Sequence, residues 1–305
     1  FPTRRSSDLS KQVSQIQDLT AEEVSALVIT PVDPYGLGSV LETVKEADIP
    51  VFSYDDLIMN TSAVKYYVTF GGRQVGQIIG KQIVDAQELD KVREAKESRT
   101  IEFFMGSLDD TQALFLYNGL MEVLQEYLDD GTLVCKSGNM TFDSTGILRW
   151  DQDAAQAKMK SILDEFYQEE KTPNIIITAS DEFAIGVQEL LEERGILSDS
   201  EEWPVITGYG SEMQAVKDVA EGKITLTTYL DRKELAQGGA KMALDYLAGE
   251  KVDVKDYSQY DNGTKIVGTF TCGAQLIDKD NYQILVDNGT YDEEEIKPDP
   301  TPTAT

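Results

Sequence analysis

The sequence predicts an α/β protein made of two doubly wound units with parallel sheets. Short apolar runs alternate with segments of helical periodicity almost throughout the chain, and this is the pattern of strands joined by crossover helices. The 305 residues exceed what one compact core usually contains. With 41% apolar residues there is enough material for a core in each of two units.

The first half of the chain supplies one unit and the start of the next. In order, we expect a helix tail at 11–19, a strand at 26–31, a helix at 37–47, strands at 50–54 and 64–70, a helix at 71–86, a strand at 101–105 and a helix at 110–128. Gly72, Gly76 and Gly80 are spaced four apart on the third helix. This spacing favours close helix packing, and a phosphate cradle is the alternative.

The second half repeats the alternation. We expect strands at 133–136, 174–178, 204–207, 224–229 and 265–270, and helices at 151–167, 181–194, 212–220 and 235–247. Gly195 lies just past the end of one of these helices, where a glycine commonly ends a helix. The sequence therefore predicts a second parallel sheet covered by helices.

The composition excludes several classes of partner. The chain carries 27 Lys and Arg against 55 Asp and Glu, a formal charge of −28. Such a surface repels phosphate backbones and anionic headgroups, so neither nucleic acid nor a membrane surface is an expected partner. No apolar run is long enough to span a bilayer.

The sequence also lacks the residues that catalysis and metal binding most often use. The chain has no histidine, which removes the usual general acid-base residue and the commonest metal ligand. Cys135 and Cys272 are too few for a zinc site and are expected to be free thiols. We expect no cofactor, no metal and no enzymatic activity.

Both ends are set apart from the fold. Residues 1–9 (FPTRRSSDL) have no helical or strand pattern and read like a translated sequencing adapter, so we expect them to be an artefact that replaces the true amino terminus. An export signal would then be missing with it. Residues 297–305 are rich in Pro and Thr and are expected to be disordered.

Candidate ligand contacts follow the strands, because ligands of open α/β sheets bind beyond the carboxyl ends of the strands. The segments in question are 54–56, 107–112, 179–181, 208–211 and 230–231. Asp at a strand end serves as a turn or cap residue about as often as it contacts a ligand. Trp150 beside Arg149 is equally compatible with a core position.

Several long motifs resemble the periplasmic binding proteins for xylose and multiple monosaccharides. These are the stretch 106–151, YDDLI at 54–58, DRKELA at 231–236, YDNGTKIV at 260–267 and DNYQILVDNGTY at 280–291. The resemblance runs from Lys11 to Ile296. It implies a type I periplasmic-binding fold, in which two Rossmann-like lobes are joined by three crossing strands and hold a sugar in the cleft.

The resemblance also implies a division of the chain. We expect an amino-terminal lobe of 10–105 with 232–270, which lacks its first strands, and a carboxy-terminal lobe of 106–231 with 271–296. The crossings are expected near 105–107, 229–232 and 270–273.

The resemblance identifies Asp55 as a carboxylate that accepts hydrogen bonds from sugar hydroxyls, and Trp150 as an indole near the sugar. Further candidate ligand contacts are Asp56, Thr111, Gln112, Ser180, Tyr209, Gly210 and Leu230. The family usually has Arg at 56, Asn-Asn at 111–112, Asp at 210 and Lys at 230, so these departures leave the particular sugar open. Asp56 next to Asp55 is compatible with an amino sugar or with two solvated acids.

The function that follows is an extracytoplasmic receptor of an ABC-type importer, in the periplasm or as a cell-surface lipoprotein. It closes on a monosaccharide by hinge bending and docks on a permease; a chemoreceptor or sensor kinase is a further compatible partner. The alternatives are the effector domain of a sugar-responsive repressor and a sugar-modifying enzyme. The lack of histidine argues against an enzyme. The motif Tyr209-Gly-Ser211 does so too, because it lacks the second glycine of a nucleophile elbow.

Overall fold

The computed structural model describes residues 4–201 and 203–298. The chain divides into two compact units. The first unit comprises 1–71, 109–112 and 231–273, and the second comprises 72–108, 113–230 and 274–305. The chain therefore passes from one unit to the other more often than the three crossings expected from the sequence.

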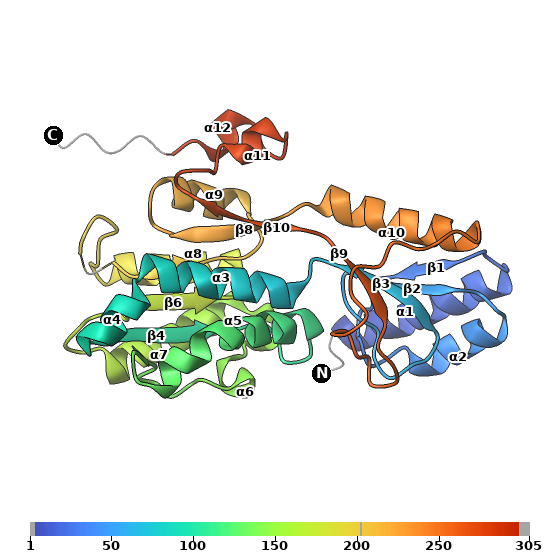
Figure 1. Ribbon diagram of the computed structural model, residues 1–305, viewed down its shortest axis with the longest axis horizontal. Helices are drawn as coiled ribbons and strands as arrows, with labels where there is room; N and C mark the ends of the chain where they lie inside the picture. The colour runs from blue at the N-terminus through green and yellow to red at the C-terminus, as the bar shows by residue number, and fades with distance from the viewer. Residues whose placement is uncertain (1–3, 202, 299–305) are drawn as a thin grey trace. The chain divides into compact units, whose positions relative to one another are not determined.

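The first unit is built on a parallel sheet of four strands in the order β1-β2-β3-β9. These strands are β1 (Leu27–Ile29), β2 (Val51–Tyr54), β3 (Val64–Thr69) and β9 (Gly268–Thr271). Helices α1 (Arg4–Ala21) and α2 (Gly38–Glu46) cover one face of this sheet, and α10 (Arg232–Leu247) covers the other (Figure 1). Tyr246 of α10 packs edge-on against Phe52 of β2, with ring centroids 5.6 Å apart.

The second unit is built on a sheet of six strands in the order β10-β8-β7-β6-β4-β5. They are β4 (Arg99–Phe104), β5 (Leu133–Val134), β6 (Ile175–Thr178), β7 (Val205–Thr207), β8 (Leu226–Leu230) and β10 (Ala274–Asp278). All neighbours are parallel except β10, which pairs antiparallel with β8. The expected parallel sheet is thus confirmed, with an antiparallel edge strand that the sequence did not predict.

Helices cover both faces of this second sheet. They are α3 (Gly72–Ala86), α4 (Leu89–Ala95), α5 (Thr111–Asp129), α6 (Phe142–Thr145), α7 (Gln152–Phe166), α8 (Asp181–Glu193), α9 (Met213–Ala220), α11 (Ile284–Asp287) and α12 (Glu293–Ile296). Alternate residues of the strands enter opposite cores. Ile175 and Ile177 of β6 pack with α3 and α5, whereas Ile176 packs with α7, α8 and α9. Successive side chains of a strand point to opposite faces, so this split is the doubly wound arrangement.

The glycines of α3 allow the close approach of two helices. A Cβ atom at Gly76 would lie 2.2 Å from the carbonyl oxygen of Leu116 on α5, and one at Gly119 would lie 1.9 Å from the carbonyl oxygen of Arg73 on α3. Both distances are too short for any side chain. The packing interpretation is therefore confirmed for Gly76, and a Cβ atom at Gly80 would also lie only 3.0 Å from the Val123 Cβ on α5.

Several boundaries differ from those expected, and residues 109–112 and 271–273 lie in the first unit and not in the second. Residues 72–105 belong to the second unit, because β4 pairs with β5 and β6 and α3 packs on α5. Helix α1 begins at Arg4, within the segment expected to lack helical structure. Of the predicted disordered tail at 297–305, residues 299–305 lie outside the described residues.

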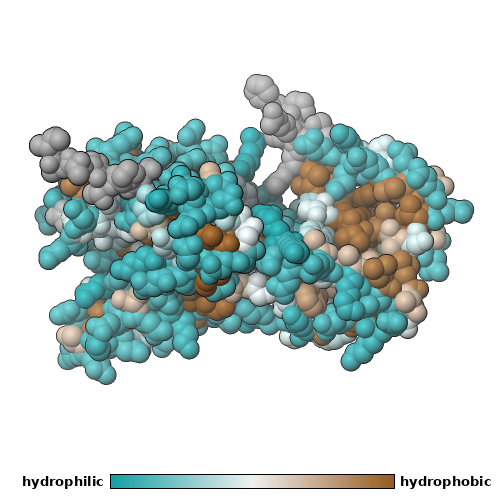
Figure 2. Space-filling view, turned by 90° about the horizontal axis from the view of Figure 1, so that it is seen from above, coloured by the Kyte–Doolittle hydropathy of each residue, from teal (hydrophilic) through white to brown (hydrophobic). Residues whose placement is uncertain are grey.

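The surface is largely hydrophilic, with apolar areas between the polar side chains (Figure 2). Exposed apolar side chains of the first unit include Val28 on the edge strand β1 and Leu244 and Leu247 on α10. No helix in the described part of the chain is long and apolar enough to cross a membrane. Cys135 and Cys272 are both free thiols, as expected.

Candidate ligand-binding residues

The candidate residues fall into two groups, one in each unit. Asp55, Asp56, Thr111 and Gln112 belong to the first unit. Trp150, Ser180, Tyr209, Gly210 and Leu230 belong to the second.

Asp55 lies directly after β2 and adopts a left-handed backbone conformation with a φ of 65°. Its N–H donates to the carbonyl oxygen of Val68 on β3 at 2.9 Å. Its carboxylate receives no hydrogen bond from any residue that the structure describes. A non-glycine residue in this conformation is strained, and such strain is typical of functional positions.

The surroundings of Asp55 shift the pKa of its carboxyl group in both directions. Burial raises the pKa of the Asp55 carboxyl, the nearby Arg232 guanidinium lowers it, and Asp110 raises it. A partly buried carboxylate that keeps its acceptor positions free suits the hydroxyl groups of a polyol. The sequence pointed to Asp55 but gave no sign of Arg232 as its neighbour.

Gln112 is joined to Asp55 through the backbone of the latter. The Gln112 side-chain amide donates to the Asp55 carbonyl oxygen at 2.8 Å and to Thr69 Oγ1 at 2.8 Å. It also contacts the hydroxyl of Tyr67, a buried residue that the sequence did not single out. Thr111 beside it is 5% exposed, and its hydroxyl has no hydrogen-bond partner among the described residues.

The backbone of Asp56 makes two hydrogen bonds within the turn. Its N–H donates to the Tyr54 carbonyl oxygen at 2.8 Å, and its own carbonyl oxygen accepts from Ser53 Oγ at 2.6 Å. The Ser53 hydroxyl in turn accepts from the Ile58 N–H at 2.9 Å. These bonds fix the turn that carries Asp55.

In the second unit, Trp150 follows another strained residue. Arg149 and Trp150 have φ angles of 61° and 55°. The Arg149 N–H donates to the buried Ser107 Oγ at 2.9 Å, which anchors this turn just beyond β4. The indole of Trp150 contacts both cores of the unit and keeps part of its surface exposed.

Ser180 is the N-cap of α8, and its hydroxyl accepts from the Phe183 N–H at 3.2 Å. The hydroxyl therefore has a structural role as a helix cap. The next residue, Asp181, was expected only as part of a strand-end segment. Its N–H donates to the Tyr209 carbonyl oxygen at 3.1 Å, which joins the turns after β6 and β7.

Asp181 is the buried centre of this second group. Its carboxylate accepts from Thr227 Oγ1 at 2.5 Å and from the Glu212 N–H at 2.6 Å. Burial raises its pKa to about 7, although these hydrogen bonds lower it. A Cβ at Gly208 would lie 2.3 Å from the carboxylate, so the carboxylate occupies the space of a side chain at this position.

Gly210 and Leu230 complete the set. Gly210 has a φ of 135°, which only glycine adopts readily, and its N–H donates to the Thr228 carbonyl oxygen at 3.1 Å. Leu230 ends β8 opposite Ala274 of β10. The structure thus joins the turn of Tyr209 to the start of α8 through the Asp181 N–H, and it places Leu230 at the end of β8, the strand that pairs with β7.

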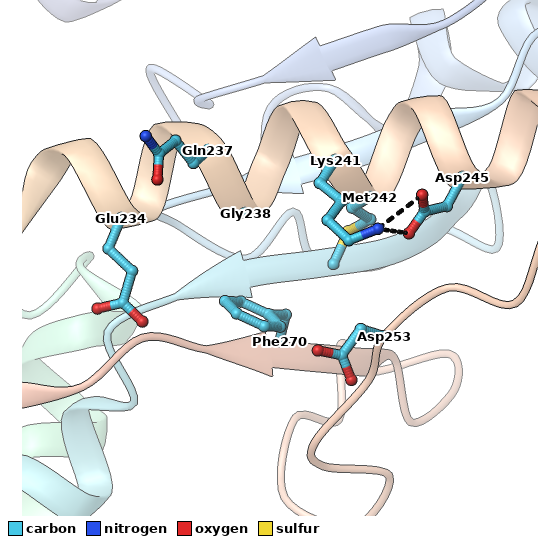
Figure 3. A pocket seen from close by; sticks show the side chains of 8 residues that line it. All are labelled: Glu234, Gln237, Gly238, Lys241, Met242, Asp245, Asp253 and Phe270. Carbon is cyan, nitrogen blue, oxygen red and sulfur yellow. Dashed lines mark hydrogen bonds and ion pairs between the residues drawn. The ribbon is translucent and has the colours of Figure 1, made fainter.

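A separate pocket of about 220 Å³ lies in the first unit between α10 and the strand β9. Figure 3 shows the Lys241 ammonium paired with the Asp245 carboxylate on α10, with Phe270 on the strand opposite. The two charged groups are 2.8 Å apart. None of the residues predicted for ligand binding lines it. Among the described residues, no group of three or more His, Cys, Asp or Glu side chains could hold a metal ion.

Two α/β units with polar and aromatic side chains after their strands define the class of the type I periplasmic-binding fold. Residues 3–251 match the family model described as a periplasmic binding protein domain. The chain belongs to this family. The family consists of receptors and not of enzymes, which agrees with the expected class of protein.

Similar proteins cover nearly the whole chain. The multiple sugar-binding periplasmic receptor ChvE of Rhizobium radiobacter is 35% identical over 95% of this chain and 81% of its own. The multiple sugar-binding periplasmic protein SbpA of Azospirillum brasilense is 36% identical over 95% of this chain and 80% of its own. The crystal structure of an ABC transporter solute-binding protein from Clostridium phytofermentans, with bound β-D-glucose, is 34% identical and superimposes with a TM-score of 0.86. The superposition covers 96% of this chain and 88% of the Clostridium phytofermentans chain.

Proposed function

We propose that this protein is the solute-binding subunit of an ABC-type importer and that it binds a monosaccharide outside the cytoplasm. The likeness to a glucose-bound solute-binding protein, at 34% identity and a TM-score of 0.86, carries the proposal. Relatives named as multiple sugar-binding receptors support it over nearly the whole chain. These comparisons do not favour the repressor alternative.

The residues within each unit fit a neutral sugar. Asp55 offers carboxylate oxygens that accept no hydrogen bond from the described residues, and Trp150 offers an aromatic surface that suits the C–H face of a pyranose. We propose these two as ligand contacts. Asp181 is proposed to support the turn that carries Tyr209 and Gly210, because its carboxylate accepts from the Glu212 N–H, whereas the Ser180 hydroxyl caps α8.

Delivery of the sugar to a membrane permease is the proposed second half of the function. Location in the periplasm, or on the cell surface as a lipoprotein, belongs to the same proposal. Docking on a chemoreceptor or sensor kinase stays a prediction. All three follow from the kind of receptor proposed and not from a contact in the structure.

A thermal-shift panel tests the proposal directly. Pentoses, hexoses, amino sugars and nucleosides are added one at a time, including D-glucose and D-xylose. A ligand at about 100 times its Kd stabilises the folded state by roughly 2.7 kcal/mol, which gives a clear rise in melting temperature. A rise with one class of sugar is the expected result. Melting temperatures that none of the sugars changes would refute the monosaccharide proposal.

A further inference from the structure

The backbone of Asp55 is held by two side chains that meet at one atom. The Tyr67 hydroxyl donates to the Asp55 carbonyl oxygen at 2.5 Å, and the Gln112 amide donates to the same oxygen at 2.8 Å. Because Asp55 has a φ of 65°, its backbone conformation is strained, and it persists only where surrounding contacts offset the cost in free energy. The two donors supply such contacts.

Both donors are themselves fixed. Tyr67 is fully buried on β3 and packs edge-on against Tyr260, with ring centroids 5.4 Å apart. The Gln112 amide also donates to Thr69 Oγ1 at 2.8 Å, and the Gln112 N–H donates to the Asp110 carboxylate at 2.8 Å. A rigid donor pair of this kind can hold one backbone carbonyl in place.

The arrangement separates the two ends of Asp55. Its carbonyl oxygen is bound by Tyr67 and Gln112, and its N–H is bound by Val68 at 2.9 Å. Its carboxylate is left without a donor among the described residues. The protein thus fixes the backbone of Asp55 and leaves its carboxylate able to accept hydrogen bonds from a ligand.

We propose that Tyr67 and Gln112 are positioning residues that orient the Asp55 carboxylate for the ligand. Gln112 then acts through its amide nitrogen on the protein and not as a direct ligand contact, and Tyr67 is a determinant of affinity that the sequence did not reveal. The inference rests on the proposed function, since it needs a sugar that Asp55 binds. Preorganised side chains raise affinity because less freedom is lost on binding.

The substitution Tyr67→Phe tests this inference, because it removes the hydroxyl and keeps the buried ring. Kd for D-glucose and D-xylose is measured by calorimetry well below the melting temperature of each variant. We expect Kd to rise about 2- to 10-fold, the range for one net hydrogen bond. The matched control is Tyr66→Phe on the same strand, whose hydroxyl makes no hydrogen bond within the described part of the chain. Its Kd should be unchanged.

A double-mutant cycle distinguishes positioning from a general loss of stability. Tyr67→Phe is repeated in an Asp55→Asn background, with Kd taken from NMR titration so that weak binding is still measured. Asn adopts the left-handed conformation readily and lacks the carboxylate, so the effect of Tyr67→Phe should fall below 2-fold. An equal loss of affinity in both backgrounds would overturn the inference, as would a lower melting temperature with an unchanged Kd.

Failure of the proposed function would look different. If the wild-type protein bound neither probe nor any other sugar of the panel, the proposed function would fall and the inference with it. If the wild-type protein bound sugar and Tyr67→Phe bound it equally well, only the positioning role would fall.

Discussion

The indole of Trp150 is stacked on the ring of Phe183, with ring centroids 5.9 Å apart and an interplanar angle of 26°. Gly106 makes room for this arrangement, because a Cβ there would lie 2.1 Å from the indole ring. Phe183 is fully buried in the core of the second unit. One face of Trp150 is therefore bound to the protein, and a ligand can reach only the remaining surface.

A fluorescence experiment tests whether that surface meets the sugar. In the variant Trp203→Phe, Trp150 is the single tryptophan, since the chain has two. We expect its emission to change on titration with D-glucose, because stacking alters the surroundings of the indole. The reciprocal variant Trp150→Phe leaves Trp203 as the reporter and should give no change. A response that survives in Trp150→Phe and disappears in Trp203→Phe would contradict the prediction.

Removing the charge of Asp55 should weaken sugar binding strongly. Asp55→Asn keeps the size of the side chain and tolerates the φ of 65°. A hydrogen bond to a charged group contributes about 1.5–3 kcal/mol, so Kd should rise roughly 10- to 100-fold in calorimetry. Asp48→Asn is the matched control, because Asp48 also has a positive φ of 56° but lies exposed after α2. Equal affinities of the two variants would remove Asp55 from the site.

The buried carboxyl of Asp181 should make stability depend on pH. Its pKa is raised to about 7 in the folded protein from an ordinary value of 3.8. A raised folded-state pKa favours the protonated form, so the contribution is full below the ordinary value and is lost as pH rises through about 7. The change is at most about 1.4 kcal/mol for each pH unit inside this window.

The variant Asp181→Asn isolates this contribution, because Asn does not titrate. We expect the stability of the wild-type protein relative to the variant to increase as pH falls from 8 to 5, measured by urea unfolding at each pH. Other titrating groups cancel in the difference. A difference that is independent of pH would show that Asp181 titrates below this range.

The helix crossing of α3 and α5 should not tolerate a larger residue at Gly119. A Cβ there would lie 1.9 Å from the Arg73 carbonyl oxygen, and a backbone atom cannot move aside as a side chain can. We expect Gly119→Ala to cost about 1–3 kcal/mol, seen as a lower midpoint of urea unfolding. Gly273→Ala is the control, since nothing lies within 4 Å of the added atom. Its midpoint should stay near that of the wild-type protein, and an equal fall in both variants would contradict the steric explanation.

Much of the fold followed from local pattern. The apolar run at 174–178 and the alternating run at 64–70 became β6 and β3, and the helical periodicity at 181–194 became α8. Such patterns are legible because the strand period of two and the helix period of 3.6 are set by the backbone. The spacing of Gly76 and Gly80 likewise predicted that another helix packs closely on this one, and the structure identifies that helix as α5.

The sequence by itself determined the α/β class and the order of most elements, and it predicted Asp55 and Trp150 as ligand contacts. Only the tertiary structure decided that β10 pairs antiparallel with β8, that β4 belongs to the second unit, and that Tyr67 and Gln112 meet at the Asp55 carbonyl oxygen. The physical reason is the range of the interactions. Period and capping are local properties of the chain, whereas the partner of a hydrogen bond between distant segments depends on how the whole sheet is assembled.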